Sequence, residues 1–110
     1  MSKFAMISQP MGNKTDAEIR EAKDRATRYL EENGYSVLDT LFEFDDELVK
    51  NSGVNNIPVF YLAKSIEELS KASVVYFCDG WEKARGCWLE HSVCKSYGIP
   101  IIYEKRPSWL

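Results

Sequence analysis

The sequence is short of the residues that most often build metal centres, disulfide frameworks and membrane spans. It has one histidine and three cysteines in 110 residues, and Cys78, Cys87 and Cys94 form no C-x-x-C pair. An odd number of unpaired cysteines is typical of reduced thiols in the cytosol, and a single histidine argues against a histidine-rich metal site. No apolar run approaches the roughly 18 residues of a membrane-spanning helix, and no apolar signal region precedes the first predicted strand. We therefore expect a cytoplasmic protein with no metal and no membrane partner.

An excess of positive charge is lacking as well, because the formal net charge is −3. Proteins that bind duplex nucleic acid neutralise its phosphates with a basic face, so this class is disfavoured. A small anionic ligand needs only a few local donors and stays possible. The sequence also lacks the G-x-G-x-x-G fingerprint and the G-x-x-x-x-G-K-[ST] phosphate loop, which argues against dinucleotide-dependent redox enzymes and ordinary ATPases. We expect no cofactor.

What is present indicates one globular domain that covers residues 1–110. The hydrophobic fraction is 45% and the charged fraction 28%, as in ordinary globular proteins of this size. Short apolar runs predict strands at 3–8, 35–39, 73–78 and 99–103. A capping box at 15–18 begins a helix that runs to about 33, and further helices are expected at 59–72 and 84–97. The stretch 40–56 is interpreted as a loop with room for a short helical turn.

This order of elements predicts an α/β fold, with a doubly wound, flavodoxin- or Rossmann-like sheet. We expect a mostly parallel sheet of four to five strands with helices on both faces. In such sheets ligands bind beyond the carboxyl ends of the strands, where the strand order reverses. Two loops leave those ends, at 8–14 and 79–86. Both lead into helix N-termini, where free amides and the helix dipole favour anions.

The first loop offers hydrogen-bond donors in Ser8, Gln9, Asn13 and Lys14. Such a loop can equally be the capped turn that any α/β domain needs. In the second loop, Gly80 lets the backbone come close to a ligand. The same holds for Gly86, at the end of that loop.

Trp81, in the same loop, could offer a flat face to a base or sugar, and Glu90 follows Gly86 by four residues. A carboxylate early in a helix can point back toward the cleft and act as a nucleophile. The structural alternatives are a glutamate that complements the helix dipole, a His91 that only packs, and an Arg85 that is only surface charge.

Three segments together resemble a known family: 6–11 (Met-Ile-Ser-Gln-Pro-Met), 61–66 (Tyr-Leu-Ala-Lys-Ser-Ile) and 80–91 (Gly-Trp-Glu-Lys-Ala-Arg-Gly-Cys-Trp-Leu-Glu-His). The family consists of small proteins of gut Firmicutes and their phages, and the likeness covers almost the whole chain. It is similar to a compact branch of the nucleoside 2-deoxyribosyltransferase superfamily, which includes 2′-deoxynucleoside 5′-monophosphate N-hydrolases. Members of that superfamily are commonly oligomers, so the resemblance implies a homo-oligomer.

In that superfamily a glutamate in a Gly-x-x-x-Glu pattern attacks the anomeric carbon of a deoxyribosyl group. The resemblance implies this nucleophilic role for Glu90, with Asp79 and His91 as candidate helpers, and a nucleoside or nucleotide as substrate. The substrate-binding residues expected from the loops and the matched segments are Ser8, Gln9, Met11, Lys14, Ser65, Trp81, Arg85 and Gly86.

The chain departs from the superfamily pattern at two helper positions. Ser73 stands where an aspartate usually begins the third strand, and Met6 stands where a tyrosine of the first strand orients the nucleophile. Asp79, Tyr61 and His91 are the candidates to replace them. Two further hypotheses follow: a nucleotide-binding module without turnover that sequesters a signal for phage or host, and an assembly protein with a vestigial cleft.

Overall fold

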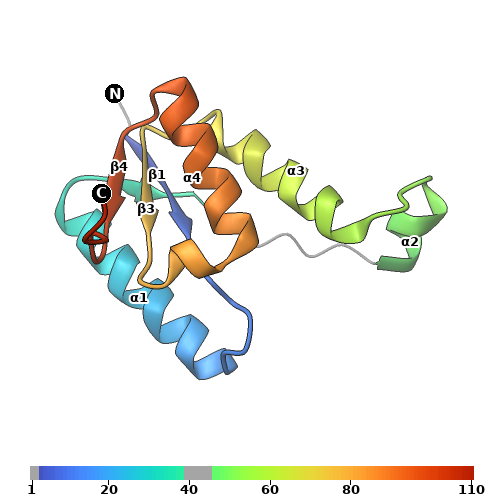
Figure 1. Ribbon diagram of the computed structural model, residues 1–110, viewed down its shortest axis with the longest axis horizontal. Coiled ribbons are helices and arrows are strands. Elements are labelled where there is room, and N and C mark those ends of the chain that lie inside the picture. Colours follow the sequence, from blue (N-terminus) through green and yellow to red (C-terminus); the bar gives the residue numbers. More distant parts are fainter. Residues whose placement is uncertain (1–2, 39–45) are drawn as a thin grey trace.

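The computed structural model describes residues 3–38 and 46–110 and shows a parallel α/β sheet with helices on both faces (Figure 1). The strands are β1 (Phe4–Ser8), β2 (Ser36–Val37), β3 (Val74–Phe77) and β4 (Ile101–Tyr103). They are all parallel and lie in the order β2-β1-β3-β4. The predicted fold class is therefore confirmed. The strand order reverses between β1 and β3, so the crevice expected for a ligand lies at the carboxyl ends of these two strands.

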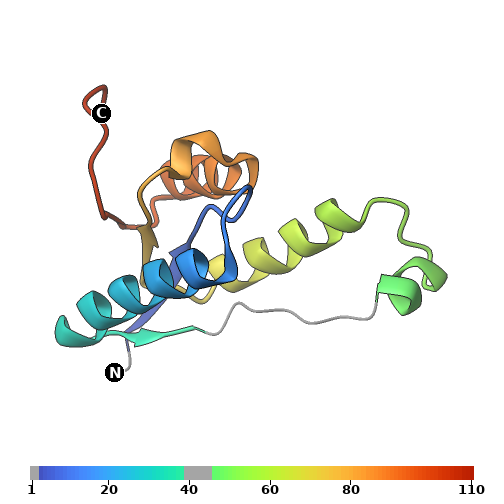
Figure 2. The same cartoon turned by 90° about the horizontal axis from the view of Figure 1, so that it is seen from below.

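One face of the sheet is covered by α1 (Asp16–Glu32), which Figure 2 shows opposite α4. The helix begins at the predicted capping box. The Thr15 hydroxyl accepts a hydrogen bond from the Glu18 amide at 3.1 Å, and the Glu18 carboxylate accepts one from the Thr15 amide at 3.0 Å. Ala26 and Leu30 are fully buried against the side chains of β1 and β3 that point to this face.

The other face is covered by α4 (Arg85–Tyr97) and by the C-terminal end of α3 (Ile57–Leu69). Successive side chains of β1 point to opposite faces of the sheet. Ala5 packs in the core on the α1 side, and Met6 packs in the core on the α4 side. A short 3-10 helix, η1 (Trp81–Lys83), connects β3 to α4. Helix α4 ends at Tyr97, as predicted, and Gly98 follows with a φ of +71°, which favours glycine.

The remaining helix is α2 (Asp46–Asn51), which lies beside α3 away from the sheet (Figures 1 and 2). It falls in the stretch that was interpreted as a loop with a short helical turn, and residues 39–45 of that stretch lie outside the described residues. Helix α3 begins at Ile57, two residues before its predicted start. The Asn56 side chain accepts a hydrogen bond from the Val59 amide at 3.1 Å, and Pro58 occupies the first turn, where a missing amide proton costs nothing. Within the described residues, no helix combines the length and apolarity needed to cross a bilayer.

Candidate functional site

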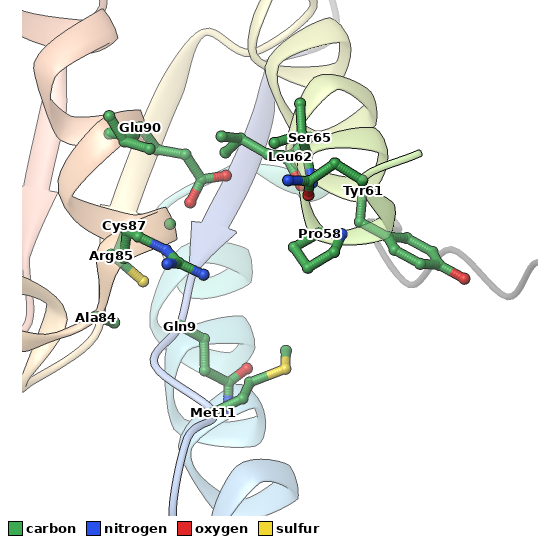
Figure 3. Close-up of a pocket in the computed structure, with 14 residues that line it drawn as sticks. Gln9, Met11, Pro58, Tyr61, Leu62, Ser65, Ala84, Arg85, Cys87 and Glu90 are labelled. Atoms are coloured by element: carbon green, nitrogen blue, oxygen red, sulfur yellow. The ribbon is translucent and has the colours of Figure 1, made fainter. Parts of the chain in front are cut away.

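A pocket of about 590 Å³ lies at the carboxyl end of β1, between α3 and the first turns of α4 (Figure 3). Its wall on the α3 side is largely apolar. The pocket is lined by Gln9, Met11, Asn56, Pro58, Val59, Tyr61, Leu62, Ser65, Ala84, Arg85, Gly86, Cys87, Leu89 and Glu90. This volume is in the range of pockets that bind small molecules.

Glu90 is the buried charged residue of this pocket. Its side chain extends from α4 toward the cavity, with Leu62 and Ser65 of α3 on the opposite wall (Figure 3). The residue is 7% exposed, and the Ser8 hydroxyl donates a hydrogen bond to Glu90 Oε1 at 2.7 Å. Burial raises the pKa of the Glu90 carboxyl, and the hydrogen bond from Ser8 opposes this shift because it stabilises the ionised form.

Six of the predicted site residues meet in this pocket: Gln9, Met11, Ser65, Arg85, Gly86 and Glu90. A Cβ added at Gly86 would meet no atom within 4 Å. Packing within the chain therefore does not require a glycine at this position, and there is open space beside it in the pocket wall. Gly80 differs, because its φ of +87° lies in the region that favours glycine.

Lys14 and Asp79 lie elsewhere, in a neighbouring cavity of about 760 Å³. That cavity is open to the loops after β1 and β3, and it shares Ala84, Arg85 and Gly86 with the Glu90 pocket. Asp79 is exposed and its amide donates to the Glu104 carboxylate at 2.9 Å. The structure therefore does not bring Asp79 beside Glu90.

Trp81 and His91 are placed in the core between α4 and the sheet. Trp81 is 0% exposed and stacks on the His91 ring with 4.1 Å between the ring centroids. His91 Nε2 lies 2.6 Å from the Tyr103 hydroxyl, and burial lowers the pKa of this histidine. Neither residue lines the Glu90 pocket. His91 therefore packs in the core, as its structural alternative has it, and the Trp81 ring lies there too instead of facing the pocket.

Tyr61 lines the pocket, but its hydroxyl lies away from Glu90. Its ring points away from the Glu90 carboxylate (Figure 3), and its hydroxyl donates to Asp46 Oδ1 at 3.0 Å. None of the three proposed replacements for the missing aspartate and tyrosine helpers is therefore within hydrogen-bond reach of Glu90 in the structure.

Sequence reasoning missed much of the α3 wall, above all Asn56, Pro58 and Leu62. The available signal was their spacing. Pro58, Leu62 and Ser65 are four and three residues apart and share one face of a helix. Sequence analysis named only Ser65 of this face as substrate-binding, whereas in the structure all three residues line the pocket.

The chemistry that this arrangement permits centres on one carboxylate and one guanidinium. Burial raises the pKa of the Cys87 thiol to about 11, so this cysteine is not a thiolate nucleophile near neutral pH. In residues 3–38 and 46–110, no group of three histidine, cysteine, aspartate or glutamate side chains is arranged to hold a metal ion. Glu90 can accept a proton, attack a carbon or stabilise a nearby cation, and Arg85 can pair with an anion.

Comparison with known proteins gives one family. The model of a domain of unknown function, DUF4406, matches residues 5–103. A search of curated proteins found no significant match, and neither did a search of solved structures.

Proposed function

We propose a glycosyl-transfer function for this chain, which belongs to the DUF4406 family. The protein acts as an N-glycosidase or 2-deoxyribosyltransferase on a nucleoside or nucleotide, and Glu90 is its nucleophile. The observation that carries the proposal is the position of Glu90, buried, bonded to Ser8 and facing a pocket of about 590 Å³. The Gly86 to Glu90 spacing, which resembles that of the nucleoside 2-deoxyribosyltransferase superfamily, agrees with it.

In the proposed reaction a Glu90 carboxylate oxygen attacks the anomeric carbon of the sugar. A carbon–oxygen bond forms as the bond to the base nitrogen breaks, and the base leaves with that electron pair and takes up a proton from solvent. Water, or the nitrogen of a second base, then attacks the same carbon and releases the carboxylate. The nearby negative charge stabilises the oxocarbenium-like transition states of both steps.

The lining assigns roles to other residues in this proposal. Arg85 pairs with an anionic group of the substrate, since it is the cation lining the pocket among the described residues. The apolar side chains of Leu62 and Leu89 pack against the base.

As further parts of the proposal, the protein is cytoplasmic and forms a homo-oligomer. Several large apolar side chains outside the sheet core agree with oligomer formation, because Leu48 is 67% and Val59 56% exposed.

The direct test is to incubate the protein with deoxynucleosides, ribonucleosides and their 5′-monophosphates and to measure free base by chromatography. We expect base release from at least one of these substrates. Glu90→Gln should lower the rate by at least about 100-fold, because it removes the nucleophile. Glu31→Gln, at an exposed position of α1, is the matched control and should release base at the wild-type rate. Wild-type protein that releases no base from any substrate, or an active Glu90→Gln variant, contradicts the proposal.

A second candidate function is a nucleotide-binding module without turnover. It is favoured by one observation, that no aspartate or histidine stands among the described residues that line the pocket. The leaving base then has no carboxylic acid other than Glu90 to protonate it. Calorimetry that shows tight binding of a nucleotide, recovered intact after long incubation, supports this candidate over the enzyme.

A further inference from the structure

We propose that Ser8 is a positioning residue that holds Glu90 in the orientation for attack, and that it does not bind substrate. This inference rests on the proposed function of Glu90. Sequence analysis placed Ser8 among the substrate-binding residues. In the structure it does not line the pocket, and its hydroxyl donates to Glu90 Oε1. A serine hydroxyl has a single proton to donate, so this bond leaves none for a phosphate or sugar oxygen.

The hydrogen bond from Ser8 makes the two oxygens of the Glu90 carboxylate different in their surroundings. Oε1 accepts from Ser8, and Oε2 accepts no hydrogen bond from the described residues. Within those residues, Trp81 Nε1 is the buried side-chain polar atom without a partner, so Oε2 is not sealed in the core. Glu90 lines both the pocket and a smaller adjoining cavity of about 150 Å³, which share Gln9, Met11 and Ser65. Oε2 is therefore the oxygen left free to face this joined space. Fixing one oxygen thus presents the other to a bound sugar.

The donor itself is held rigidly. Ser8 is the last residue of β1, 1% exposed, and it pairs with Phe77 of β3. Its carbonyl accepts a hydrogen bond from the Cys78 amide at 3.0 Å, which extends the ladder beyond the strand. A buried hydroxyl at the end of a strand that stays paired with β3 moves little, as a group that orients a nucleophile must.

The position of Ser8 also accounts for a departure noted in the sequence. The superfamily pattern has an orienting tyrosine in the first strand, where this chain has Met6, and Met6 is 1% exposed within the core. Residues two apart in a strand point to the same face. Ser8 therefore approaches α4 from the face on which that tyrosine would stand, but one pleat nearer the carboxyl end, and there its short side chain reaches Glu90.

The test compares Ser8→Ala and Ser8→Thr in the full chain, and it does not require turnover. Carbon-13 spectra of protein labelled at glutamate carboxyls, with the Glu90 signal assigned from its loss in Glu90→Gln, give the pH at which Glu90 titrates. We expect Ser8→Ala to titrate at a higher pH than wild type, because the alanine donates no bond to the ionised form. Ser8→Thr keeps the hydroxyl and should restore the wild-type titration. Ser92→Ala, which removes an exposed hydroxyl bonded to the Trp88 carbonyl, should leave it unchanged.

Where base release is measurable, Ser8→Ala should lower kcat by about tenfold, the scale of one charge-assisted hydrogen bond, with little change in KM. A raised KM at constant kcat would mean that Ser8 binds substrate, and this result overturns the inference. So does a Glu90 that titrates at the same pH in wild type and Ser8→Ala, whether or not the protein releases base. If the Glu90 titration shifts in Ser8→Ala but the protein releases no base, the proposed function is refuted, while the hydrogen bond from Ser8 to Glu90 is supported. If Ser8→Ala does not fold, Ser8→Cys replaces it, because a thiol is a weaker donor of similar size. The pH of the Glu90 titration and the changes in kcat and KM are then judged in the same way.

Discussion

At the scale of single residues, Glu90 is an ionisable side chain in a buried position that is unfavourable for folding. A carboxylate that loses its water without a full set of donors destabilises the folded state, and from the described residues Glu90 receives one bond, from Ser8. Its folded pKa is raised, chiefly by burial. An acid with a raised folded pKa contributes stability that is fully present below its unfolded pKa, near 4.3, and this contribution is lost as pH rises through the folded value.

Glu90→Gln should therefore be more stable than wild type at pH 7, by about 1 kcal/mol or roughly 4–8 °C in Tm. The gain should shrink on acidification and vanish below about pH 4, where the wild-type carboxyl is neutral in both states. Thermal unfolding of both proteins from pH 3 to pH 8 measures this difference. A gain that is independent of pH would point to altered packing instead of a buried charge.

At the scale of elements, the capping box of α1 should contribute to the free energy of unfolding independently of the Glu90 pocket. Thr15→Ala removes the acceptor for the Glu18 amide and should destabilise the protein by about 1 kcal/mol in urea unfolding. Ser70→Ala, at an exposed helix end where the hydroxyl donates to the Glu67 carbonyl, is the control and should lower the free energy of unfolding less. Equal losses in the two variants would mean that the box contributes nothing specific.

Elements also show how far the sequence predicts this protein. The types of strand and helix followed from apolar periodicity, and the cap at Thr15 could be predicted because it depends on local geometry. The pairing of Glu90 with His91 as neighbouring catalytic groups was not supported, and helix geometry gives the reason. Successive residues on a helix point about 100° apart, so when Glu90 faces the pocket, His91 faces Phe77 and Trp81.

The α3 side of the pocket could not be predicted in the same way. Its apolar residues have the periodicity of a core helix, and in this helix Leu69 alone among the described residues is fully buried. Whether an apolar face packs on the sheet or lines a cavity depends on where the helix lies in space. That position follows from tertiary contacts and not from the pattern within the helix.

At the scale of the whole molecule, the proposed homo-oligomer has a simple test. The chain mass is 12.7 kDa, so light scattering coupled to size exclusion should give a multiple of this value near micromolar concentration. The physical reason is the set of exposed apolar side chains on α2 and α3, which association would remove from water. A mass of one chain at all accessible concentrations would contradict an oligomer.

The Ser8–Glu90 bond joins residues that are 82 positions apart in the chain, and this separation has a consequence for biosynthesis. At ribosomal rates of about 5–20 residues per second, Ser8 is made roughly 4–16 seconds before its acceptor. During that interval β1 and α1 can form, but the contact between Ser8 and Glu90 cannot. A nascent chain released before α4 emerges would carry β1, β2 and β3 but would lack the α4 side of the Glu90 pocket.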